Sequence, residues 1–328
     1  TRKNRSRLTD FIPFCALSEA KGMVINMRIR VLTIGLLLVL AVVFTGCGGM
    51  TGTKDTKTIK IGSQTFSEPK ILAEMMKLLI EKNLGYKVEH VTNLSASTIV
   101  HQAMLNKEVD ISTRYTGTEM TGPLGLEQPI FDRKQAFDFV QTEFGKRFNQ
   151  TVFAPYGFEN TYALTVRGDV AQKYGLTKAS DLAPHAASMK LGTDTSFLDR
   201  EADGYQALAQ VYGFTFGKTY PMEIGLVYKA VKDEEVDTVI AYSTDARIRS
   251  FDLKVLADDK NFFPPYEAVI IARNETLEQF TGVKEELAKL SGIIDTDTMT
   301  ELNYLVDEKK MAPEKVALDF LTKKGLIK

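Results

Sequence analysis

The sequence has no tryptophan, only 2 cysteines, only 3 histidines and no excess of charge of one sign. Its 41 basic residues nearly balance 42 acidic residues over 328 positions, so a nucleic-acid partner is not expected. The histidines, His90, His101 and His185, lack the spacing of metal ligands, and neither a metal nor a cofactor is expected. No phosphate-binding loop, dinucleotide-binding glycine pattern or nucleophile-elbow motif occurs. These absences favour a protein that is not an enzyme.

A long hydrophobic segment is also missing, because the apolar run at residues 31–45 is shorter than the roughly 20 residues that cross a bilayer. Basic residues precede this run and Phe-Thr-Gly-Cys ends it, which resembles a bacterial lipoprotein signal peptide over residues 27–47. Cys47 would then carry the lipid and anchor the protein at the extracytoplasmic face of the cell membrane. An uncleaved membrane anchor is the alternative. Residues 1–26 show no sustained periodicity and are interpreted as a non-native leader.

Little cysteine is left for the folded part of the chain. Cys15 falls within the leader, so no disulfide is expected and the fold depends on its hydrophobic core. The polar segment 48–57, rich in glycine, threonine and lysine, is typical of a flexible tether between lipid and domain.

From residue 58 onward, short apolar strands alternate with amphipathic helices, a pattern that predicts an α/β fold with largely parallel strands. Ser67 is expected to cap the first helix, and another helix is expected around residues 199–212. The chain ends in three predicted helices, at residues 277–290, 297–306 and 313–324.

The alternating pattern runs through two series, which predicts two α/β lobes joined by two crossing strands. Because the last helices follow the second series, they are expected to return to the first lobe. Lobe I is predicted to contain residues 58–162 and 264–328, and lobe II residues 163–263.

One short arrangement occurs in both series. Asp110 is followed five residues later by Tyr115 and then by a hydroxyl residue, and Asp237 is followed in the same way by Tyr242. Both tyrosines end a predicted strand, one in each lobe. Ligands of open α/β sheets bind beyond the carboxyl ends of the strands, so these tyrosines are expected on facing walls of one cleft. The alternative is that each is an ordinary, half-buried tyrosine at a strand end.

Longer segments carry a family resemblance. The motifs IKIGSQTFSE, YGFENTYALTV and DDKNFFPPYEAV, with the segments around both repeats, resemble the substrate-binding lipoproteins of osmoprotectant ABC transporters for glycine betaine, carnitine and choline. The resemblance extends from residue 57 to the C-terminus. It implies the bilobal type II periplasmic-binding-protein fold, a permease and an ATPase as partners, and a receptor that works as a monomer without a chemical step.

The resemblance also implies a ligand site. In that family a cage of tyrosines surrounds the quaternary ammonium group of the ligand. The matching positions here are Tyr115, Tyr162, Tyr242 and Tyr266. Gln64 and Thr118 match residues that hold the polar end of the ligand. A trimethylammonium group has no N–H to donate, so aromatic faces must offset its loss of water, each contact contributing about 0.5–2 kcal/mol. No carboxylate is required for such binding.

Thr118 bears on ligand choice. Choline-restricted members of the family have aspartate at this place, which would repel a ligand carboxylate, so Thr118 favours a pocket that also accepts glycine betaine and carnitine. The alternatives are a choline-restricted receptor of the same family, a bilobal binding protein for another small cationic solute, or a surface adhesin. Arg114, next to Tyr115 in an alternating strand, is expected to point away from it and to have a mainly structural role.

Overall fold

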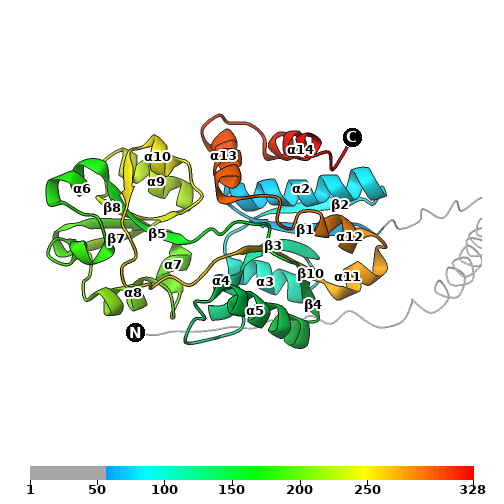
Figure 1. Ribbon diagram of the computed structural model, residues 1–328, viewed down its shortest axis with the longest axis horizontal. Coiled ribbons are helices and arrows are strands. Elements are labelled where there is room, and N and C mark those ends of the chain that lie inside the picture. The colour runs from blue at the N-terminus through cyan, green and yellow to red at the C-terminus, as the bar shows by residue number, and fades with distance from the viewer. Residues whose placement is uncertain (1–56) are drawn as a thin grey trace, which may run out of the picture. The chain divides into compact units, whose positions relative to one another are not determined.

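The computed structural model describes residues 57–328, which belong to one unit of the chain (Figure 1). The predicted leader, the signal peptide, Cys47 and residues 48–56 of the tether lie outside the described residues. None of the helices within residues 57–328 is long and apolar enough to cross a membrane.

The first of two sheets has five strands in the order β2-β1-β3-β10-β4. The strands are β1 (Ile59–Gln64), β2 (Val88–Leu94), β3 (Ile111–Tyr115), β4 (Gln150–Val152) and β10 (Ala268–Arg273). β1 is parallel to β2 and β3, whereas β10 is antiparallel to β3 and β4. Along β10, Ala268 and Ile270 face one core while Val269 and Ile271 face another, because successive side chains of a strand point to opposite faces.

The second sheet repeats this topology in the order β7-β6-β8-β5-β9. The strands are β5 (Tyr162–Arg167), β6 (Lys190–Thr193), β7 (Lys218–Pro221), β8 (Thr238–Tyr242) and β9 (Leu253–Val255). β6 is parallel to β7 and β8, and β5 is antiparallel to β8 and β9. β8 therefore occupies the place in this sheet that β3 occupies in the first.

The repeated aspartates have equivalent roles in the two sheets. Asp110 accepts a hydrogen bond from the backbone N–H of Lys60 through Oδ2 at 2.9 Å, and Asp237 accepts one from the N–H of Lys190 at 2.9 Å. The N–H of each aspartate in turn donates to the carbonyl of that same lysine. Each aspartate thus fixes the start of its strand, β3 or β8, against the neighbouring parallel strand.

Helices cover both sheets and define two lobes. The first lobe has α2 (Ser67–Leu84), α3 (Ser97–Leu105), α4 (Thr116–Thr121), α5 (Arg133–Phe148), α11 (Asn274–Gln279), α12 (Val283–Ala288), α13 (Thr296–Asp307) and α14 (Pro313–Lys323). The second has α6 (Gly168–Tyr174), α7 (Thr195–Asp199), α8 (Tyr205–Tyr212), α9 (Ile224–Lys232) and α10 (Arg247–Ser250). Short 3-10 helices at Ala179–Leu182 and Ala186–Ser188 also belong to the second lobe. In Figure 1, the C-terminal α14 lies beside α2 of the first lobe, and the two helices share one core.

The chain passes between the sheets twice, after β4 and again before β10. The two passages meet as an antiparallel pair at a single bridge between Glu159 and Glu267. These crossing segments carry two tyrosines of the predicted cage, Tyr162 at the start of β5 and Tyr266 just before β10.

Three local predictions are wrong. Ser67 does not cap α2, because its hydroxyl donates to Asp307 Oδ1 at 2.5 Å, and Phe66 is the N-cap residue. The helix predicted around residues 199–212 begins only at Tyr205, because α7 ends at Asp199 and Gly204, the N-cap of α8, lies against the carbonyls of Phe197 and Arg200, too close for a side chain. The predicted helix at 277–290 is also two, because Gly282 takes a left-handed conformation with φ of 86°.

Candidate functional site

In each sheet, the central strand β3 or β8 ends in a tyrosine. Tyr115 is the last residue of β3 and Tyr242 the last residue of β8. In the antiparallel pairing, Tyr162 lies directly opposite Tyr242, and Ala268, two residues after Tyr266, lies opposite Tyr115. The repeated sheet topology therefore brings one strand-end tyrosine and one tyrosine of a crossing segment to the inner edge of each lobe.

The four tyrosines and Phe66 form a continuous chain of aromatic rings, called here the aromatic cage. The rings of Tyr162 and Tyr266 lie 5.6 Å apart between centroids, and those of Tyr162 and Tyr242 also lie 5.6 Å apart. Phe66 meets Tyr242 edge to face at 5.1 Å and stacks on Tyr115 at 6.5 Å. Phe66 belongs to the first lobe and Tyr242 to the second, so the chain of rings joins the lobes.

The aromatic cage surrounds a cavity of about 50 Å³, the interlobe cavity. It brings together all six residues that the sequence motifs predicted for the ligand: Gln64, Tyr115, Thr118, Tyr162, Tyr242 and Tyr266. The other residues that line it are Phe66, Ser97, Asn160, Ser196 and Arg200. Cys47, predicted to carry a lipid, lies outside the described residues.

Arg200 is the charged residue of the cavity that the sequence motifs did not identify. Its guanidinium carbon lies 5.7 Å from the ring centroid of Tyr266 and 5.9 Å from that of Tyr162. Its Nε donates to Asp203 Oδ1 at 2.7 Å, and its Nη2 donates to Thr121 Oγ1 of the first lobe at 2.7 Å. Arg200 stands one residue beyond α7, and no local pattern marks it, because its cavity position arises from contact between lobes.

Two of the cage tyrosines donate their hydroxyl groups to buried carboxylates. The Tyr115 hydroxyl donates to Glu68 Oε1 at 2.7 Å, and the Tyr266 hydroxyl donates to Asp203 Oδ2. Burial raises the pKa of all four tyrosines well above the ordinary value, so the phenols are neutral. The cage thus presents neutral rings, two of which are backed by a carboxylate.

The glycine of the Tyr-Thr-Gly-Thr motif has a packing role. A β-carbon on Gly117 would lie 2.8 Å from the carbonyl oxygen of Pro265 and 2.8 Å from the ring of Tyr266. The hydroxyl of Thr116 donates to the same carbonyl at 3.0 Å and accepts from the N–H of Glu267 at 3.0 Å. Thr116 and Gly117 therefore hold the crossing segment that carries Tyr266 against the end of β3.

Arg114 has the structural role that was expected. It is buried, and its Nε and Nη2 donate to the two carboxylate oxygens of Glu119 at 2.8 Å each. Nη2 also donates to Ser97 Oγ at 2.9 Å. This pair fixes the turn that carries Thr118, which lies next to Glu119.

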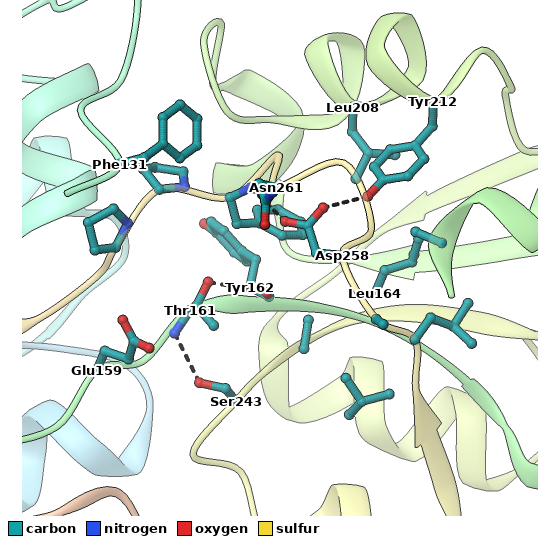
Figure 2. A pocket seen from close by; sticks show the side chains of 18 of the residues that line it. Phe131, Glu159, Thr161, Tyr162, Leu164, Leu208, Tyr212, Ser243, Asp258 and Asn261 are labelled. Carbon is teal, nitrogen blue, oxygen red and sulfur yellow. Dashed lines mark hydrogen bonds between the residues drawn. The ribbon is translucent and has the colours of Figure 1, made fainter. Parts of the chain in front are cut away.

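Two larger cavities adjoin the site. One of about 490 Å³ lies along the crossing segments and shares Tyr162 with the cage; Figure 2 shows Glu159, Thr161 and Ser243 on its wall. The other, of about 600 Å³, shares Ser97, Thr118, Ser196 and Arg200 with the interlobe cavity. Of these three cavities of the described chain, the interlobe cavity is the one lined by all six predicted residues, and Thr118 and Arg200 stand where it meets the 600 Å³ cavity.

Comparisons with known proteins identify the family of the chain. Residues 57–323 match the OpuAC model, described as the substrate binding domain of ABC-type glycine betaine transport systems. The carnitine transport binding protein OpuCC of Listeria monocytogenes is 46% identical, over 85% of this chain and 89% of the relative. The ergothioneine transport permease/binding protein EgtU of Helicobacter pylori is 34% identical over 83% of this chain and 48% of its own length. A crystal structure of a glycine betaine/carnitine/choline ABC transporter is 46% identical, with a TM-score of 0.67, over 82% of this chain and 99% of that one.

Proposed function

Because the chain belongs to the OpuAC family, the substrate-binding domains of ABC-type glycine betaine transport systems, we propose that it captures a trimethylammonium compound that also bears a carboxylate. Glycine betaine and carnitine have this chemistry. The observation that carries the proposal is the closeness of five aromatic rings and one guanidinium group around a single interlobe cavity.

The aromatic cage suits the cationic end of such a ligand. A trimethylammonium group gains from ring faces through its charge and from apolar contact through its methyl groups. At about 0.5–2 kcal/mol for each ring, four rings support micromolar affinity, about 8 kcal/mol, after the costs of association and closure. Tyr115, Tyr162, Tyr242 and Tyr266 are the proposed cage residues, with Phe66 between the lobes.

The carboxylate end is assigned to Arg200, Thr118 and Gln64. Asp203 and Thr121 accept from Nε and Nη2 of Arg200, so its other N–H donors, on Nη1, are the ones proposed for the ligand carboxylate. Arg200 stands where the interlobe cavity opens toward the 600 Å³ cavity. Thr118 and Gln64 supply neutral donors on the same cavity. Choline has no carboxylate to accept from the donors at this end of the cavity, so the choline-restricted alternative is the less favoured one.

Capture is proposed to proceed by closure of the two lobes on the ligand. Arg200 of the second lobe donates to Thr121 of the first. The same arginine is thus proposed to contact the ligand and to hold the two lobes together. The loaded receptor, a monomer anchored through Cys47 at the extracytoplasmic face of the membrane, then delivers its ligand to a permease and an ATPase.

Calorimetric titration with glycine betaine, carnitine, choline and arginine tests the proposal. We expect saturable binding of the trimethylammonium compounds at about micromolar Kd and none of arginine. Arg200→Gln should weaken glycine betaine and carnitine more than choline, whereas Arg249→Gln, on the exposed surface of the second lobe, should change nothing. Heat from arginine alone, or from no compound, would show that the ligand belongs to another class.

A further inference from the structure

Glu68 is a buried carboxylate in the first turn of α2, and only 1% of it is exposed. Its Oε1 accepts from the Tyr115 hydroxyl at 2.7 Å and from Asn160 Nδ2 at 2.9 Å. Its Oε2 accepts from the Thr244 hydroxyl at 2.6 Å and from Asn303 Nδ2 at 3.2 Å. Four donors therefore fill both oxygens: Tyr115 and, from α13, Asn303 belong to the first lobe, Asn160 to a crossing segment and Thr244 to the second lobe.

This arrangement fits the ionised form of the carboxyl group. A carboxylate is an acceptor only and has about four lone-pair sites, which matches four donors. The amide of Asn303 cannot be turned around, because its Nδ2 also donates to the backbone carbonyl of Thr244 at 3.2 Å. A proton on Glu68 would have to displace one of these donors.

No cation within residues 57–328 forms an ion pair with Glu68. Two other buried carboxylates have a guanidinium partner: Glu119 pairs with Arg114, and Asp203 pairs with Arg200. A charged cluster of Asp245, Arg247 and Asp307 lines a small cavity together with Glu68. There the one guanidinium, of Arg247, pairs with Asp245 and lies 3.6 Å from Asp307. The cluster therefore supplies no positive charge that could compensate Glu68.

Resting on the function proposed above, we propose that Glu68 supplies the counter-charge of the bound trimethylammonium group and acts on it through the ring of Tyr115. A phenol that donates to a carboxylate gains electron density on its ring, and the face of that ring attracts a cation more strongly. The carboxylate charge is itself screened little in a buried setting. Glu68 is thus a specificity residue that never touches the ligand, and it favours a cation over a neutral group of the same shape.

The hydrogen bond from Thr244 links this charge to closure. Thr244 is the donor from the second lobe, so the set of four donors is complete only when the lobes are together. Asp194, also buried and without an ion pair in the described chain, caps α7. Burial is the main cause that raises the pKa of Tyr162 and Tyr242, and the charge of Asp194 raises it further. Its charge remains when Glu68 is neutralised, so the effect of Glu68 should be partial.

A pair of isosteric ligands tests the inference. Glycine betaine and 3,3-dimethylbutanoate have the same shape and the same carboxylate, but a carbon replaces the charged nitrogen in the second compound. We expect Glu68→Gln to lower the ratio of the two affinities about tenfold or more, by weakening glycine betaine alone. Thr244→Val, which removes the donor from the second lobe but no charge, should weaken both compounds equally. Glu74→Gln, on the same helix but paired with His90 and Lys77, should leave the ratio unchanged.

The competing explanation is that Glu68 only holds the lobes together. An equal loss for both compounds in Glu68→Gln would establish that role and overturn the inference. If Glu68→Gln does not fold, Tyr115→Phe keeps the carboxylate but removes its link to the ring, and an unchanged affinity ratio in that variant would overturn the inference as well. Absence of glycine betaine binding to the unmodified protein would instead refute the proposed function.

Discussion

At the scale of the residue, the cage tyrosines are not equivalent. Tyr115 and Tyr266 donate their hydroxyl groups to Glu68 and Asp203. Within residues 57–328, neither Tyr162 nor Tyr242 has a hydroxyl hydrogen bond to another side chain. The rings of Tyr115 and Tyr266 therefore have more electron density than those of Tyr162 and Tyr242, although all four residues are tyrosines. Two carboxylates therefore stand behind the rings, an arrangement that the sequence analysis did not anticipate.

Thr118 gives a prediction at this scale. Thr118→Asp should shift binding toward choline, because an aspartate on the cavity wall repels a ligand carboxylate and accepts from the choline hydroxyl. A change of at least about tenfold in the choline to glycine betaine affinity ratio, about 1.4 kcal/mol, is expected by titration calorimetry. An unaltered ratio would remove Thr118 from the ligand site.

At the scale of the element, the turn after β3 positions a residue from the far end of the chain. Gly117 gives Tyr266 the space to lie against this turn, and Thr116 bonds to both neighbours of Tyr266 in the crossing segment. The Tyr-Thr-Gly-Thr motif thus contributes the ring of Tyr115 to the cage and positions the ring of Tyr266.

Gly117→Ala should disturb the site without breaking α4. Its methyl group would overlap Tyr266 and the Pro265 carbonyl, each 2.8 Å from the new carbon, and is expected to cost about 1–3 kcal/mol of unfolding free energy. Glycine betaine affinity should fall together with stability in chemical denaturation and titration. Gly225→Ala, where no heavy atom lies within 4 Å of the added carbon, is the control. Normal affinity in Gly117→Ala would mean that Tyr266 is not held by this turn.

At the scale of the whole described unit, polar contacts connect the two lobes on both sides of the cage. On one side Arg200 and Asp203 meet Thr121 and Tyr266, and on the other Thr244 meets Glu68 and Asn303. We expect the carboxylates at this interface to make ligand binding depend on pH.

Choline affinity should fall on acidification, because Glu68 gains a proton and loses its charge. Choline is the suitable probe, since it has no group of its own that titrates in the acidic range. Burial raises the pKa of Glu68 above its ordinary value and outweighs the four hydrogen bonds that lower it. The counter-charge is therefore present above this raised pKa and lost as the pH falls through it. The same shift means that the ionised group costs folding free energy at neutral pH, a cost that a bound cation offsets. Titrations from pH 8 downward should show a steeper fall in the unmodified protein than in Glu68→Gln, and equal slopes would assign the effect to other groups.

Much of the fold was predictable from local patterns. Alternation of apolar strands and amphipathic helices indicated two α/β lobes, and the repeated Asp-to-Tyr spacing indicated equivalent strands, β3 and β8. The family and the bilobal fold are confirmed by the matching model and the similar structure. The limits assigned to the lobes and the ligand roles of the cage residues stay predictions. Helix breaks at Gly204 and Gly282 were missed, because tertiary packing and a left-handed backbone decide them.

The sequence by itself determined the family, the α/β class and the six cavity residues carried by motifs. Each of these depends on contiguous segments of the chain, either a motif or a local pattern of apolar residues. Tertiary structure alone decided the place of Phe66, Arg200 and Glu68. Glu68 reaches Thr244 and Asn303 across 176 and 235 positions of the chain, and no periodicity or spacing encodes contacts that form only when crossing segments bring two lobes together. The position of the Glu68 carboxylate behind the ring of Tyr115 therefore depends on the folded pair of lobes, whereas Tyr115 itself could be identified from its sequence motif.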